Sequence, residues 1–169
     1  MEQIPATISS YHQYYIDLVK TDDILKELKT QGDEFADYLS SLSEQQGNYA
    51  YAKGKWTIKE IVGHLADCER IFAYRALTFV RNDKTPLPGF EQDDYIAATN
   101  FNRRTLADLI EELRLIRASN LALFTTFTDE ELKRTGTANG NFYTVSSVLY
   151  VIAGHEKHHW NVLREKYLN

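Results

Sequence analysis

The chain is poor in cysteine, proline and glycine: its 169 residues include one cysteine, three prolines and eight glycines. With Cys68 alone, no internal disulfide can form, which excludes a disulfide-stapled scaffold and agrees with a reducing compartment. No apolar run approaches the roughly 20 residues that cross a bilayer. The N-terminal stretch MEQIPATISSYHQYY also lacks the basic start and apolar core of a signal peptide. We therefore expect a cytoplasmic protein.

The chain also has no large excess of positive or negative charge. Nineteen basic residues stand against 24 acidic ones, which gives a formal net charge of −5. This balance offers no electrostatic basis for broad contact with nucleic acid or an anionic membrane, so we expect neither as a partner. Apolar residues make up 43% of the chain, as in an ordinary globular protein. The length suits one domain over residues 1–169.

Most of the prolines and glycines fall in three stretches, residues 43–56, 82–102 and 135–143. Between these stretches the apolar residues recur with helical spacing. The pattern predicts four long amphipathic helices, over residues 22–42, 58–80, 103–127 and 144–167. Four such helices joined by two longish loops favour an all-α four-helix bundle.

The ends of these helices carry further signals. Thr57 followed by Glu60 forms a capping box at the start of the second helix, and Thr128 with Glu131 predicts a short helical turn. The tyrosine-rich stretch SSYHQYYIDLV, residues 9–19, is expected to be an N-terminal arm or short helix that packs across the bundle. The stretch TGTANGN, residues 135–141, is expected to be a loop, and we expect almost no strand.

Three histidines gather in the stretch GHEKHHW, residues 154–160, which satisfies the zinc-site pattern H-E-x-x-H. On a helix, His155 and His159 lie one turn apart on the apolar side, whereas His158 is turned about 100° away from His159. His64 flanks the core-facing side of the second helix. Three imidazoles with an open position are typical of a catalytic zinc site.

Spacing alone leaves other interpretations open. A histidine on an apolar face is more often a hydrogen-bonded core residue than a ligand, and His12, alone in the arm, is expected on the surface or in packing. A metzincin peptidase would need glycine at Val162 and histidine at Glu165, so peptidase activity is not expected. Glu156 is then solvated or holds a neighbouring histidine.

Other side chains are candidates for a role at the histidine site. Cys68 lies in the core stripe and is expected to pack as a small hydrophobe. Asp67 or Glu60 could orient His64 from the same helix, with Glu60 more often engaged in its capping box. Arg75 is placed to approach the site. The loops LPGFEQDDY and TANGNFY, residues 87–95 and 137–143, could rim a pocket.

Three long stretches carry a family resemblance: KWTIKEIVGHLADCERIFAYRAL, LPGFEQDDYIAATNFNRRTLADLIEELRLIRASNLALF and GTANGNFYTVSSVLYVIAGHEKHHWNVLREKY. They resemble the DinB/YfiT-like superfamily over roughly residues 20–167. The resemblance implies a four-helix bundle, often dimeric, in which a histidine of the second helix and an H-x-x-x-H pair of the last helix bind a divalent metal, commonly nickel or zinc. These ligands correspond to His64, His155 and His159.

The resemblance also implies two classes of function. Better-understood relatives are metal-dependent transferases that join low-molecular-weight thiols to electrophiles, and others are described as metal-dependent hydrolases. The leading hypothesis is therefore a metal-dependent enzyme that activates a thiol or water, with a small-molecule thiol or other small substrate as partner. The competing hypothesis is a non-catalytic, metal-stabilised dimeric bundle that acts as a stress-response binding module. The sequence assigns no catalytic residue beyond the metal ligands.

Overall fold

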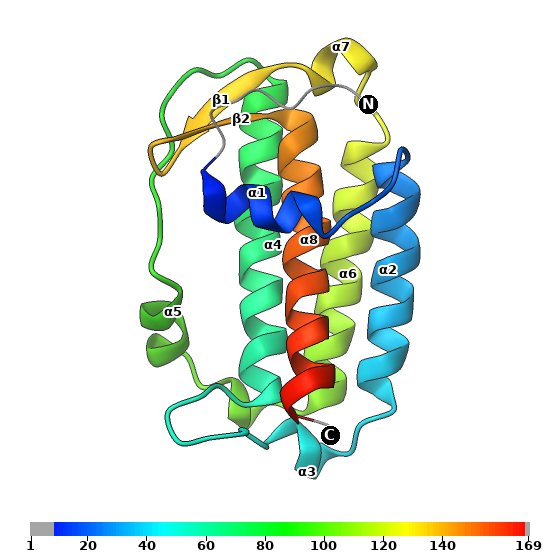
Figure 1. The fold of residues 1–169 in the computed structure, drawn as a ribbon, viewed down its shortest axis with the longest axis vertical. Helices are drawn as coiled ribbons and strands as arrows, with labels where there is room; N and C mark the ends of the chain where they lie inside the picture. The colour runs from blue at the N-terminus through cyan, green and yellow to red at the C-terminus, as the bar shows by residue number, and fades with distance from the viewer. Residues whose placement is uncertain (1–8, 168–169) are drawn as a thin grey trace.

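Four long helices lie side by side in the computed structural model, which describes residues 9–167 (Figure 1). They are α2 (Ile24–Ser40), α4 (Ile58–Val80), α6 (Leu106–Phe124) and α8 (Val145–Val162), and α8 continues as a π-helix, η2 (Leu163–Tyr167). The predicted four-helix bundle is confirmed. None of the helices between residues 9 and 167 combines the length and hydropathy that a membrane span needs.

The helices do not follow one another around the bundle in chain order. Each of α2, α6, α4 and α8 packs on the next in that order, and α8 packs back on α2, so α6 and α8 occupy opposite corners. Neighbours α4 and α6 run in the same direction (Figure 1). The chain must therefore return along the whole bundle between them, through α5 (Gln92–Ala98) and the 3-10 turn η1 (Phe101–Arg103). Two short helices, α3 (Glu44–Gly47) and α7 (Asp129–Leu132), lie in the other connections.

The residue that precedes each long helix caps it, because its side chain accepts a hydrogen bond from a free backbone N–H of the first turn. The capping box predicted for α4 is present: the Glu60 side chain accepts from Thr57 N at 2.7 Å, and Thr57 Oγ1 accepts from Glu60 N at 3.1 Å. The side chains of Asp23, Thr105 and Thr144 likewise accept a backbone N–H at the starts of α2, α6 and α8. These caps fix where the helices start and hence the level at which their side chains meet.

The prediction of a loop at residues 135–141 is wrong, because this stretch belongs to a β-hairpin. Strand β1 (Thr135–Ala138) pairs antiparallel with β2 (Asn141–Thr144). Asn139 and Gly140 form the turn with φ of 49° and 69°, the backbone that a two-residue hairpin turn requires. Leu87 bridges to Ala138, so the connection after α4 lies against this hairpin.

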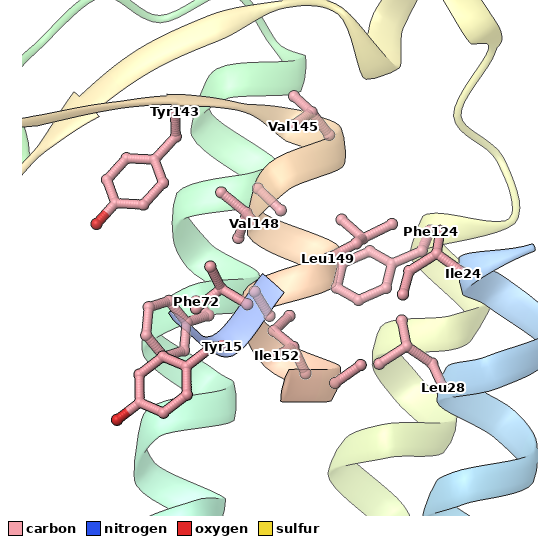
Figure 2. Packing of buried hydrophobic residues seen from close by; sticks show 14 of the residues in the cluster. Tyr15, Ile24, Leu28, Phe72, Phe124, Tyr143, Val145, Val148, Leu149 and Ile152 are labelled. Atoms are coloured by element: carbon pink, nitrogen blue, oxygen red, sulfur yellow. The ribbon is translucent and has the colours of Figure 1, made fainter. Parts of the chain in front are cut away.

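The core consists of two hydrophobic clusters. The first gathers α1, the hairpin and the adjoining ends of the long helices, and includes Leu28, Phe72, Phe124, Tyr143, Val148 and Ile152 (Figure 2). The second fills the other end and includes Phe35, Ile61, Leu65, Leu109, Leu113 and Leu163. Between them, at the middle of the bundle, lie buried polar and charged side chains: Gln31, His64, Glu69, Arg117, His155 and Glu156.

Helix α1 (Ser10–Asp17) crosses α4 and α8 on one face of the bundle, as expected for the N-terminal arm (Figure 1). It packs against α8 where the latter carries Gly154. A Cβ atom at Gly154 would lie 1.9 Å from the Tyr15 carbonyl oxygen, so only glycine allows this close approach. Ser9 caps α1 by accepting from His12 N.

Substituting Gly154→Ala should therefore displace α1. We expect the free energy of unfolding to fall by about 1–3 kcal/mol, as for other overpacked sites. Backbone amides of α1 should also exchange hydrogen faster. Urea denaturation and hydrogen exchange measure both effects, with Ser146→Ala on the same helix as the control. Unchanged protection of α1 would contradict the packing described.

Candidate metal centre

The structure brings together the three histidines proposed as ligands. His64 lies on α4, and His155 and His159 lie on successive turns of α8. One nitrogen from each ring lies within 4.8 Å of the others, and His64 Nε2 is 3.2 Å from His155 Nε2. His64 and His155 are buried, at 3% and 5% exposure, and His159 is half-buried. The three rings therefore form a cluster that reaches from the core toward one face.

The chemistry of this cluster fits a divalent metal. Two nitrogens that each lie about 2.0–2.1 Å from one ion are separated by about 3.0–3.4 Å, which matches the His64–His155 distance. Metal binding requires neutral imidazoles. Burial lowers the pKa of His64 to about 4. Burial, together with the neighbouring imidazoles, lowers the pKa of His155 and His159 well below the usual value. Three neutral nitrogen donors thus converge without a carboxylate among them.

Aromatic rings enclose the cluster. The Trp56 ring centroid is 4.8 Å from that of His64, while Tyr15 and Phe72 lie 5.3 and 6.2 Å from His155. Tyr15 comes from α1, so this helix lies against the histidine cluster. Apolar surroundings limit the access of water and strengthen electrostatic interactions within the site.

The remaining histidines do not join the converging nitrogens, although the His158 ring contacts that of His159 at 5.0 Å. His158 is half-buried, and its Nδ1 atom is 3.2 Å from the hydroxyl of Tyr14. This position agrees with the predicted angle of about 100° between His158 and His159 around the helix. His12 is buried in packing, where its ring meets Ser9 Oγ at 2.7 Å and the Tyr143 hydroxyl at 3.0 Å. Neither ring belongs to the group of converging nitrogens.

The two carboxylates that could orient His64 have other partners, in agreement with the capping role favoured for Glu60. Glu60 caps α4, and Asp67 lies 3.9 Å from Arg70. In the described part of the chain, the side chain nearest His64 Nδ1 in hydrogen-bond range is Cys68, with Sγ at 3.5 Å. Burial raises the pKa of the Cys68 thiol to about 12, so it remains protonated and packs in the core as predicted.

Glu156 is neither solvated nor bound to a histidine, so both interpretations offered for it are wrong. It is buried, and its carboxylate accepts from Arg117 Nη2 at 3.0 Å and from Gln31 Nε2 at 2.8 Å. The carboxylate is thus held by Arg117 and Gln31. Glu156 therefore cannot serve as the general base that H-E-x-x-H would supply in a peptidase.

Arg117 lies at the centre of a buried charged layer that the sequence did not reveal. Its guanidinium donates to both carboxylate oxygens of Glu69 at 2.7 and 2.9 Å, and to the Leu28 carbonyl at 2.6 Å. A Cβ at Gly32 would lie 2.7 Å from Arg117 Nη1, which explains a glycine inside α2. A cavity of about 10 Å³ separates this layer from His155.

Comparison with known proteins places the chain in a family. The family model of the DinB superfamily matches residues 27–163, so this chain belongs to the DinB superfamily. A protein of Oceanobacillus iheyensis, named as a candidate metal-dependent hydrolase, is 26% identical over 162 residues, which cover 93% of this chain and 86% of that protein.

Two solved structures share the fold. YfiT from Bacillus subtilis, described as a probable metal-dependent hydrolase with an unusual four-helix bundle topology, superposes with a TM-score of 0.65 at 20% identity, over 96% of this chain and 91% of YfiT. A mycothiol-dependent maleylpyruvate isomerase superposes with a TM-score of 0.69 at 14% identity, over 85% of this chain and 60% of the isomerase. At these identities the likeness concerns the fold alone.

Removing the central arginine should be far more damaging than removing a surface one. We expect Arg117→Ala to lower the free energy of unfolding by about 3–5 kcal/mol, because two buried carboxylates lose their partner. Arg114→Ala is the matched control: Arg114 lies on the same helix and pairs with the exposed Asp37, so its loss should change stability by less than about 1 kcal/mol. Equal effects in urea denaturation would contradict a central role for Arg117.

Proposed function

We propose that this protein is a metal-dependent enzyme in which His64, His155 and His159 bind a divalent ion, nickel or zinc, and in which a thiol or water is activated. The observation that carries the proposal is the convergence of three neutral imidazole nitrogens within 4.8 Å without a fourth histidine, cysteine or carboxylate in the group, among the described residues. Three protein ligands leave coordination positions for a reactant.

The names of similar proteins support both kinds of chemistry. The Oceanobacillus iheyensis relative and YfiT are named as metal-dependent hydrolases, and the isomerase with the same fold depends on mycothiol, a thiol. A dication of this kind lowers the pKa of a thiol or water that takes an open position. We therefore propose thiol transfer or hydrolysis as the reaction type.

The residues of this chain would contribute in distinct ways. The three imidazoles hold the ion, and Tyr15, Trp56 and Phe72 restrict water around it. Cys68 does not act as the nucleophile, because its buried thiol stays protonated at neutral pH. The ion pair of Glu156 with Arg117 connects α8 to α6.

The alternative function is a metal-stabilised bundle without catalysis, acting as a dimeric stress-response binding module. The burial of His64 and His155 favours it, since closed sites are typical of structural metals. The two functions differ in whether a reactant enters. A catalytic site should bind a small thiol, whereas a structural site should not.

Elemental analysis of protein purified without an affinity tag tests the ligands. We expect near-stoichiometric nickel or zinc in the parent and a loss of at least tenfold in His64→Ala and His159→Ala, because a site of three donors loses one of them. His158→Ala is the matched control and should keep its metal. A parent that takes up neither metal would overturn the proposed function.

Thiol titration separates the two functions. Adding 2-mercaptoethanol to cobalt-loaded parent should produce a thiolate-to-cobalt absorption band, because an open position admits the sulfur. Absence of this absorption band, combined with a large drop in melting temperature in His64→Ala, would instead support a structural role for the metal.

A further inference from the structure

Arg75 is a buried cation without a counter-charge. Its side chain lies on α4 at 3% exposure, and among residues 9–167 it forms no ion pair. Of its five N–H donors, only one meets a protein acceptor in this part of the chain, the Pro88 carbonyl at 3.3 Å. Burying a charge is unfavourable unless it is paired. Every other buried cation of the bundle core, Lys59 and Arg117, faces a glutamate.

The guanidinium lies beside the histidine cluster. The guanidinium carbon lies over the Phe72 ring at 5.2 Å from its centroid, and the His155 ring also contacts Phe72, at 6.2 Å. The same Phe72 ring lies 6.5 Å from the ring of His12, and His12 Nδ1 is 3.0 Å from the Tyr143 hydroxyl. Burial and the nearby Arg75 charge lower the pKa of His12 to about 4.

Two loops and a helix meet at this position. Pro88 belongs to the connection after α4, Tyr143 to the hairpin, and His12 and Tyr15 to α1. Figure 2 shows the phenol rings of Tyr15 and Tyr143 extending to the same side of α4, and both side chains are buried. The loops expected to rim a pocket thus come together around Arg75 rather than around the histidines alone.

We infer that Arg75, with Tyr143 beside it, binds the carboxylate of an elongated substrate or cofactor whose reactive thiol or carbonyl end lies at the histidine cluster. This assignment rests on the proposed function for the position of the reactive end. A single guanidinium fork matches one carboxylate by two parallel N–H···O bonds. A phosphate dianion would call for more positive charge than this position offers. Side chains of α1 lie near both ends, because Tyr15 contacts His155 and His12 contacts Phe72, so binding of this carboxylate ligand requires them to move.

Two thiols of equal length test this inference, 6-mercaptohexanoate and the neutral 6-mercaptohexan-1-ol. A six-carbon chain is used because the width of the Phe72 ring separates Arg75 from His155. Each is titrated into the cobalt-loaded protein, with binding followed by calorimetry and metal contact followed by the thiolate-to-cobalt band. We expect the parent to bind the carboxylate at least tenfold more tightly than the alcohol.

Arg75→Gln should abolish that preference while leaving the affinity for the alcohol within about twofold, and Arg75→Lys should retain part of it through its charge. Arg70→Gln, on the same helix but paired with Glu112, is the matched control and should keep the full preference. Melting temperatures check that each variant is folded.

The outcomes separate this inference from the proposed function. Equal affinities in the parent, or a preference that survives in Arg75→Gln, overturn the carboxylate site while a thiolate band still supports the metal chemistry. Carboxylate-selective binding that depends on Arg75 but produces no thiolate band supports the site and counts against thiol activation. Absence of binding by either compound overturns both.

Discussion

The pairing of Arg117 with Glu69 and Glu156 is the constraint on which the arrangement of the bundle depends. Arg117 lies on α6, Glu69 on the neighbouring α4 and Glu156 on α8 at the opposite corner. A buried charge tolerates little displacement, because an unpaired partner loses both solvation and Coulomb energy. The layer therefore aligns three helices at mid-height, between two hydrophobic clusters that by themselves would tolerate sliding.

This alignment also sets the histidine cluster. The ion pair of Glu156 with Arg117 fixes the rotation of α8 about its axis. His155, adjacent in sequence, and His159, one helical turn further, therefore face α4 at the level of His64. On the outer side Gly154 lets α1 approach closely, so Tyr15 covers the cluster. Helix α8 thus carries both the Glu156 contact with Arg117 and two of the three histidines of the candidate metal centre.

Local signals in the sequence predicted the parts of this structure that depend on neighbours along the chain. The Thr57 capping box set the start of α4, and helical periodicity placed His155 and His159 on one face. The hairpin was missed although Asn139–Gly140 is a strong turn signal, because its strands are only four residues each and rich in threonine and glycine. The partners of Arg117 and Arg75 depend on which helices are neighbours, and periodicity carries no information about that order.

The most direct test of the account is X-ray absorption spectroscopy of the nickel- or zinc-loaded protein, before and after addition of 6-mercaptohexanoate. We predict three imidazole nitrogens at about 2.0–2.1 Å with light oxygen ligands in the resting protein, and one added sulfur at about 2.3 Å with the thiol. A sulfur ligand already present in the resting protein would instead place Cys68 on the metal. Fewer than three imidazoles would contradict the joint role of His64, His155 and His159.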